Sequence, residues 1–241
     1  MSPQHDQPSA RPPVRTFKPR RRPLSPERSA QWDRLAPRFC LPETGGALDA
    51  AATFGRSAPL ALDIGIGAGE STLDMALADP TVDVIGADVH TPGIAASLAR
   101  IDELDLSNVR LVHGDALVFA ARLPPGTLQA IRIYFPDPWP KARHRHRRIT
   151  TVERVGRFVE LLAPGGTLHV ATDIDDYAAT TQRACDDHPD LAGGAIERPS
   201  WRPPTRYERK GLAAGRTVTD LLYTRVAHGV AHGAGHPARR G

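Results

Sequence analysis

The sequence predicts one α/β domain built on an open, doubly wound, mostly parallel sheet with helices on both faces. Three observations predict it. Short apolar segments rich in Val, Ile and Leu alternate with segments of helical length, as in repeated strand–helix units. A glycine-rich turn at 65–69 joins the first of these strands to a helix. Acidic residues follow successive strands, at the edge where such sheets bind ligands.

The strands are predicted at 59–64, 82–88, 109–113, 128–135 and 167–171, with two more near 195–198 and 217–226. Between them, helices are predicted at 71–78, at about 92–104, from a capping box at 150–153 to about 162, and after Asp173 to about 188. Residues 164–166, Pro-Gly-Gly, are expected to close the third of these helices.

The domain is predicted to span residues 25–226. It begins with a short helix after Ser25 that packs on the body through Trp32, Leu35 and Phe39. Residues 1–24 are rich in Pro and Arg, and residues 227–241 are rich in Gly, His and Ala. Both segments are therefore predicted to be disordered tails.

Composition limits the class of protein. No apolar run is long enough to span a bilayer, and the polar N-terminus is no secretory signal. Two cysteines make no disulfide framework, and no Cys/His spacing suggests a metal site, so we expect a reduced, cytoplasmic setting. The net charge is +4, with the positive charge concentrated in the tails and in residues 141–148. This distribution favours a local contact with a polyanion.

Five acids lie at or near the carboxyl ends of predicted strands: Asp63, Asp88, Asp115, Asp137 and Asp173. Any one could be a turn or cap residue, but five at one edge would repel each other without cationic partners or ligands. We therefore expect a ligand site there.

The turn Gly65-x-Gly67-x-Gly69 lets the backbone approach a ligand. Glu70 stands where a dinucleotide site wants its third glycine, and it would oppose a pyrophosphate. A cofactor with a cationic amino-acid end suits Asp63 better, with Asp88 for ribose hydroxyls and Asp115 for an adenine amino group. These residues favour S-adenosylmethionine. NAD is the alternative, and a glycine turn without a ligand is the third interpretation.

The strand at 128–135 runs directly into Pro-Asp-Pro-Trp-Pro and then into a basic run. Three prolines stiffen the loop and hold one carboxylate, Asp137, and one indole, Trp139. The indole could stack on a base or pack into the body. The basic run suits phosphates, although such runs are also common on solvated surfaces. Its expected RNA contacts are Arg143, His144, Arg145, His146, Arg147 and Arg148.

These segments resemble the bacterial tRNA (guanine-N7-)-methyltransferases, and the resemblance covers roughly residues 28–226. The most specific match is Phe135-Pro136-Asp137-Pro138-Trp139-Pro140-Lys141 with the basic run behind it. Further matches are 62–70, 88–90, 108–110, 114–116, 171–173 with Tyr177, and 205–211. Two departures are Asp at 63 and 88, where the family often has Glu, and the lack of a Trp after Asp173.

The resemblance implies a Rossmann-like methyltransferase sheet and methyl transfer from S-adenosylmethionine to N7 of a tRNA guanosine, usually position 46 in the variable loop. It also implies that the cofactor pocket includes Asp63, Asp88, Asp115 and Asp137, beside the turn residues Gly65 and Gly67. The implied substrate-binding residues are Lys141, Asp173, Thr205, Arg206, Tyr207 and Glu208.

Guanine N7 has a free lone pair, so the reaction needs alignment and a carboxylate near the developing cation rather than a base. We assign that carboxylate to Asp137, and we expect Glu208 to accept from guanine N1–H and N2–H. Three alternatives stay open: a methyltransferase for another RNA or a small molecule, a catalytically idle RNA-binding protein, and an NAD oxidoreductase. The expected partner is tRNA, with the chain as monomer or homodimer.

Overall fold

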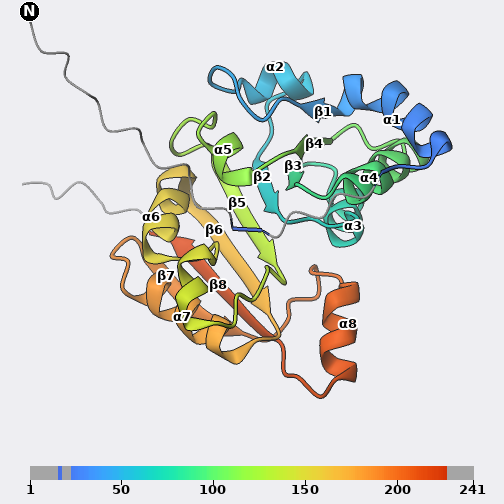
Figure 1. The fold of residues 1–241 in the computed structure, drawn as a ribbon. Helices are drawn as coiled ribbons and strands as arrows, with labels where there is room; N and C mark the ends of the chain where they lie inside the picture. Colours follow the sequence, from blue (N-terminus) through green and yellow to red (C-terminus); the bar gives the residue numbers. More distant parts are fainter. Residues whose placement is uncertain (1–15, 18–22, 227–241) are drawn as a thin grey trace, which may run out of the picture.

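The structure is a computed structural model that describes residues 16–17 and 23–226. Its centre is an eight-stranded sheet in the order β1-β4-β3-β2-β5-β6-β8-β7 (Figure 1). The strands are β1 Cys40–Leu41, β2 Leu60–Ile64, β3 Asp83–Asp88, β4 Val109–His113, β5 Leu128–Tyr134, β6 Leu162–Thr172, β7 Leu191–Ile196 and β8 Thr219–Arg225. The tails predicted at 1–24 and 227–241 lie outside the described residues, apart from 16, 17, 23 and 24.

The sheet is parallel from β1 to β6 and antiparallel beyond. Strand β2 pairs in parallel with β3 on one side and with β5 on the other, whereas β8 runs antiparallel to both β6 and β7. The doubly wound, mostly parallel sheet is thus confirmed. Because the strand order reverses at β2, the switch point lies at the carboxyl ends of β2 and β5.

Helices cover both faces of the sheet (Figure 1). They are α1 Pro26–Phe39, α2 Ala50–Phe54, α3 Glu70–Ala78, α4 Thr91–Glu103, α5 Ala116–Ala120, α6 Val152–Leu161, α7 Asp175–Asp186 and α8 Arg206–Ala213, with a 3-10 helix η1, Ala142–Arg147. One apolar core lies between the sheet and α1, α3 and α4, and the other between the sheet and α5, α6 and α7. Within the described residues, no helix is both long and apolar enough to cross a membrane.

The predicted helix after Ser25 is confirmed as α1, whose first turn is capped by the Ser25 hydroxyl accepting from the Arg28 N–H at 3.4 Å. The prediction that residues 164–166 close a helix is wrong. Helix α6 ends at Leu161, and 164–166 form a bulge within β6. Glycine is needed there because a Cβ on Gly166 would lie 2.7 Å from the Leu128 carbonyl oxygen.

One face of the sheet carries a polar row across its centre. Asp63 on β2 pairs in register with Arg132 on β5, and Arg132 pairs with His169 on β6. Their apolar neighbours Ile131 and Leu168 point into the core under α5, α6 and α7, so by strand alternation the row faces the side of α3. Side chains of this row are buried. Buried polar groups need partners, and the partners of this row form the candidate site.

Candidate active site

A cleft opens at the switch point, between the ends of β2 and β5, the loop 65–69 with the start of α3, and the segment that enters α8. The space between these elements, open solvent at the mouth included, amounts to about 520 Å³. Its lining residues are Asp63, Ile64, Gly65, Ile66, Ala68, Glu70, Ser71, Thr72, Arg132, Tyr134, Phe135, Thr205, Arg206 and Tyr207. The structure thus brings the first glycine turn and the segment 205–207 to one cavity.

The glycine turn is held in an unusual backbone conformation. Gly65, Gly67 and Gly69 have φ of 76°, 60° and 75°, in the left-handed region that glycine adopts without cost. Asp88 accepts hydrogen bonds from the Gly67 N–H at 2.7 Å and from the His90 N–H at 2.7 Å. Burial raises the pKa of Asp88, and these N–H groups act against that rise. Asp88 therefore ties the turn to the end of β3.

Asp63 and Arg132 form a buried ion pair at the floor of the cleft. The Arg132 Nε lies 3.0 Å from the Asp63 Oδ1, and a further guanidinium nitrogen, Nη1, contacts the Met75 sulfur at 3.1 Å. Among the described residues, three buried atoms of this pair have no aligned hydrogen-bond partner: both carboxylate oxygens of Asp63 and the Nε of Arg132. Burial raises the pKa of Asp63, and the charge of Arg132 opposes the rise. The pair is thus electrostatically balanced but incompletely bonded.

Asp115 lies at the carboxyl end of β4 and caps α5 by accepting from the Leu117 N–H at 2.9 Å. Its own N–H donates to the Glu43 Oε1 at 2.5 Å. A Cβ on Gly114 would lie 2.7 Å from the Glu43 carboxyl carbon, so this approach requires glycine. Burial raises the pKa of Asp115, and the nearby Glu43 adds to it. Glu43 was not predicted as a site residue, because it stands alone in a loop outside every motif of the sequence.

Helix α8 lies against the glycine turn. A Cβ on Gly67 would lie 4.0 Å from the Tyr207 ring, and the Arg209 guanidinium lies 3.7 Å from Glu70 at the start of α3. The helix begins at Thr205, whose hydroxyl accepts from the Glu208 N–H at 3.0 Å. Helix α8 was not predicted, because its first turn, Arg206 to Arg209, contains no aliphatic residue that could begin an apolar helical repeat.

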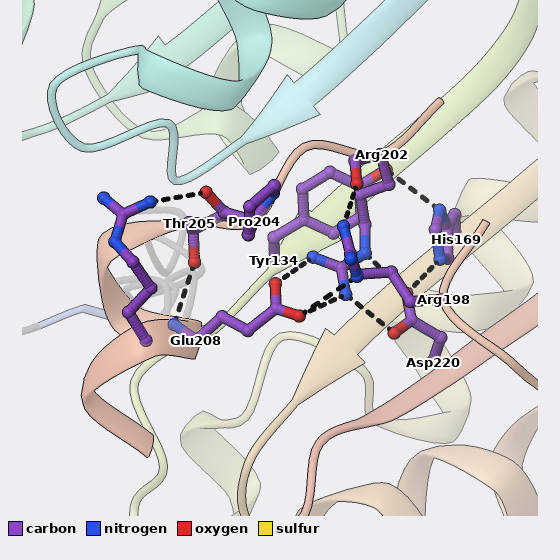
Figure 2. Close-up of polar contacts among 9 residues, drawn as sticks. Tyr134, His169, Arg198, Arg202, Pro204, Thr205, Glu208 and Asp220 are labelled. Carbon is purple, nitrogen blue, oxygen red and sulfur yellow. Dashed lines mark hydrogen bonds and ion pairs between the residues drawn. The ribbon is translucent and has the colours of Figure 1, made fainter. Parts of the chain in front are cut away.

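Arg202 is fully buried and joins α8 to the sheet (Figure 2). Its guanidinium donates to both oxygens of Asp220 on β8, at 2.7 and 2.8 Å. It also donates to both oxygens of Glu208, at 2.6 and 3.3 Å, and the Arg198 guanidinium approaches Glu208 at 3.4 Å. Glu208 was expected to meet guanine, but its carboxylate is buried and engaged by Arg202.

The same network continues to the wall of the cleft (Figure 2). His169 Nε2 lies 2.7 Å from Asp220 Oδ1, and His169 Nδ1 lies 2.9 Å from the Tyr134 hydroxyl. Burial lowers the pKa of His169 despite Asp220, so the ring is neutral at pH 7. Because a carboxylate only accepts, Nε2 carries the proton and Nδ1 accepts from Tyr134. Tyr134 lines the cleft, so cleft and α8 share one polar network.

Asp137 is half-buried in the loop that follows β5. The loop leaves the strand at Phe135, which has a φ of 53° and lines the cleft. Trp139 is 6% exposed and its indole N–H donates to the Thr16 carbonyl at 2.8 Å. Of the two interpretations of Trp139, the structure therefore has it packed into the body.

The basic run is divided between surface and interior. Lys141, Arg143, Arg145 and His146 are exposed, and the Arg147 guanidinium lies over the Trp139 ring at 5.0 Å. Partial burial and the flanking cations lower the pKa of His144, so this residue adds less positive charge to the run than an ordinary histidine would.

Arg148 was expected to contact RNA, but its side chain is buried. It donates to Asp176 on α7 at 2.6 Å and to the Thr180 hydroxyl at 2.9 Å, and these bonds fix η1 to the domain.

Asp173, at the end of β6, pairs with Arg216 at 2.8 Å and lies against Gly211 of α8. In the part of the chain that the structure describes, no cluster of three or more His, Cys, Asp or Glu could hold a metal.

Comparison with known proteins gives consistent matches. The family profile described as "Putative methyltransferase" matches residues 57–221. The tRNA (guanine-N(7)-)-methyltransferase of Nitrosospira multiformis is 41% identical over 88% of this chain and 94% of its own length. The enzyme of the same name from Nocardioides sp. is 43% identical, over 88% of this chain and 87% of its own.

Solved structures agree on the fold alone. The 16S rRNA methyltransferase KamB has a TM-score of 0.53 at 18% identity, over 76% of this chain and 96% of KamB. A Streptococcus mutans protein solved in complex with SAH has a TM-score of 0.50 at 12% identity, over 85% of this chain and 100% of its own.

Replacing Arg202 by Met should lower the free energy of unfolding by about 3–5 kcal/mol, because it leaves Glu208 and Asp220 buried without a counter-ion. Burial raises the pKa of Asp220, but the bonds from His169 and Arg202 outweigh it and hold the pKa below its usual value. The stability that Asp220 contributes is therefore present above about pH 4 and lost as the pH falls through its folded pKa.

Urea unfolding from pH 3 to pH 7 measures this, with the exposed Arg209→Met as the matched control. The network would be contradicted if Arg202→Met lowered the free energy of unfolding no more than the control does. It would also be contradicted if the difference in this free energy between wild type and Arg202→Met grew below pH 4.

Proposed function

Because this chain belongs to the tRNA (guanine-N(7)-)-methyltransferase family, we propose that it transfers the methyl group of S-adenosylmethionine to N7 of a guanosine in tRNA, usually position 46 of the variable loop. The observation that carries this proposal is the shared cleft. One cavity is lined both by the glycine turn expected to bind the cofactor and by residues 205–207 expected to bind the substrate.

Several features of the cleft, and of the ends of β3 and β4 next to it in the sheet, fit S-adenosylmethionine. The buried Asp63 has oxygens without hydrogen-bond partners among the described residues, which suits an ammonium group. Gly65 and Gly67 leave room at the turn, since nothing lies within 4 Å of a Cβ built at Gly65. Asp88 can accept further bonds from ribose hydroxyls. Asp115 at the end of β4 can accept from the adenine amino group.

When bound, the cofactor supplies a methyl group on a sulfonium. The chain's residues then have to align guanine N7 with that methyl and stabilise the positive charge that passes to the purine. We assign the charge stabilisation to Asp137, which follows the cleft residue Phe135 by two positions and stands between two prolines. No proton has to be removed from N7, so Asp137 acts as a carboxylate and not as a base.

In this proposal the substrate binds to the start of α8, and Lys141 and Asp173 also contact it. Thr205, Arg206 and Tyr207 line the cleft. Glu208 contributes by anchoring the first turn of α8 to Arg202 and orienting those residues. The exposed part of the basic run, Lys141, Arg143, Arg145 and His146, contacts phosphates of the tRNA.

The direct test is incubation of the full chain with S-adenosylmethionine and unmodified tRNA, followed by nucleoside mass analysis. The proposal expects 7-methylguanosine. Methylation of another nucleoside, or of small molecules only, would support the alternative of a different methyl acceptor. Tight tRNA binding without any methyl transfer would point to an idle RNA-binding protein.

Replacing Asp137 by Asn should lower kcat by about 100-fold or more, because the carboxylate acts on charge that develops only in the transition state. The affinity for S-adenosylhomocysteine (SAH), the demethylated cofactor, should stay within about threefold of the wild-type value when measured by calorimetry. Asp33→Asn, an exposed change on α1, is the control. A parallel loss of rate and SAH affinity would instead make Asp137 a binding residue.

Replacing Arg143 and Arg145 together by Gln should make the slope of log K against log salt for tRNA binding less steep by about 1–2. Filter binding from low to moderate salt measures the slope. The control is Arg157→Gln on α6, which removes an exposed charge outside η1. An unchanged slope in the double variant would exclude η1 from the RNA interface.

A further inference from the structure

Arg132 is a buried cation that the proposed mechanism does not use. It stands between Ile131 and Ile133 in the centre of β5 and is 9% exposed, yet it lines the cleft. Its contacts are a 3.0 Å ion pair with Asp63 and a 3.1 Å contact with the Met75 sulfur. A thioether is a weak acceptor, so most of the hydrogen-bonding capacity of this guanidinium is unused within the described residues.

Its partner Asp63 is in the same condition. Both carboxylate oxygens are buried, and neither has an aligned hydrogen bond among the residues that the structure describes. The hydroxyl of Thr72, which also lines the cleft, is near enough to act against the rise in the pKa of Asp63, but it is not aligned for a hydrogen bond. A buried ion pair is stabilising only when further bonds satisfy the remaining donors and acceptors. Because both groups border the cleft, a ligand can supply those bonds.

We propose that Arg132 binds the α-carboxylate of the cofactor's methionine end while Asp63 binds its α-ammonium. The inference rests on the proposed function and adds a residue to its site. A zwitterion laid over the Asp63–Arg132 pair places each charge beside its opposite, and it completes the bonds that the pair leaves open.

Other positions in the cleft suit a carboxylate less well. The start of α3 carries Glu70, whose charge opposes an anion at that helix end. Arg206 is exposed on α8, where its guanidinium lies over the Tyr207 ring at 5.4 Å, on the substrate side. Arg132 is the cation that lies beside the expected ammonium site, with its Nε 3.0 Å from Asp63 Oδ1.

The experiment is calorimetry on the full chain with two ligands: SAH and its decarboxylated analogue, which keeps the amine and lacks the carboxylate. The wild-type chain should bind SAH about tenfold or more tightly than the analogue. Arg132→Met should lose about tenfold or more of the SAH affinity. It should lose much less of its affinity for the analogue, because the analogue has no carboxylate for Arg132 to bind.

Arg56→Met is the matched control. Arg56 also pairs with a buried aspartate, Asp83 at 2.6 Å, but at the amino end of β3. It should change neither affinity. Arg132→Lys, which keeps a cation, should recover part of the preference for SAH and serves if the Met variant does not fold.

Equal binding of the two ligands by the wild type would overturn the inference without any variant. An equal loss of both ligands in Arg132→Met would also overturn it, because Arg132 would then only support the fold around Asp63. A wild-type chain that binds neither ligand would overturn the proposed cofactor itself, which separates that failure from the failure of the inference.

Discussion

The buried polar side chains on one face of this sheet need partners, and the place where those partners lie determines where the cleft lies. Asp63, Arg132 and His169 stand in register on β2, β5 and β6. An apolar helix packed on this row would leave its buried polar groups without hydrogen-bond partners, at a cost of several kcal/mol. The row is instead covered by a polar network and by the cleft. The site therefore occupies the part of the face that apolar packing could not cover.

Arg202 holds in place α8, whose first residues line the other side of the cleft. Its bonds to Asp220 and Glu208 tie β8 to α8 across the interior (Figure 2), and α8 brings Tyr207 to the glycine turn. The antiparallel strand β8 thereby supplies Asp220, the carboxylate to which α8, the proposed substrate-side helix, is anchored through Arg202. The cofactor side and the substrate side of the site are consequently parts of one packed unit.

Much of the fold could be predicted from the sequence because its signals are local. Apolar strands, a glycine turn and acids at strand ends each occupy a few consecutive residues, so the switch point and Asp63, Asp88 and Asp115 could be placed. Arg132 could not, since a single cation inside the apolar run 131–135 makes no pattern. The only available signal was that a charge so placed needs a partner. Glu208 was assigned to guanine because its buried partner, Arg202, lies in a loop without periodicity.

In the proposed function, one edge of the sheet receives both the cofactor and the RNA. Hydrogen–deuterium exchange of the full chain, alone, with SAH and with SAH plus tRNA, tests it most directly. The account predicts that SAH slows exchange in 63–70 and around Asp88 and Asp115, and that tRNA extends the protection to η1 and the first turn of α8. Protection by tRNA confined to α1 and α6, with η1 and α8 unchanged, would contradict it.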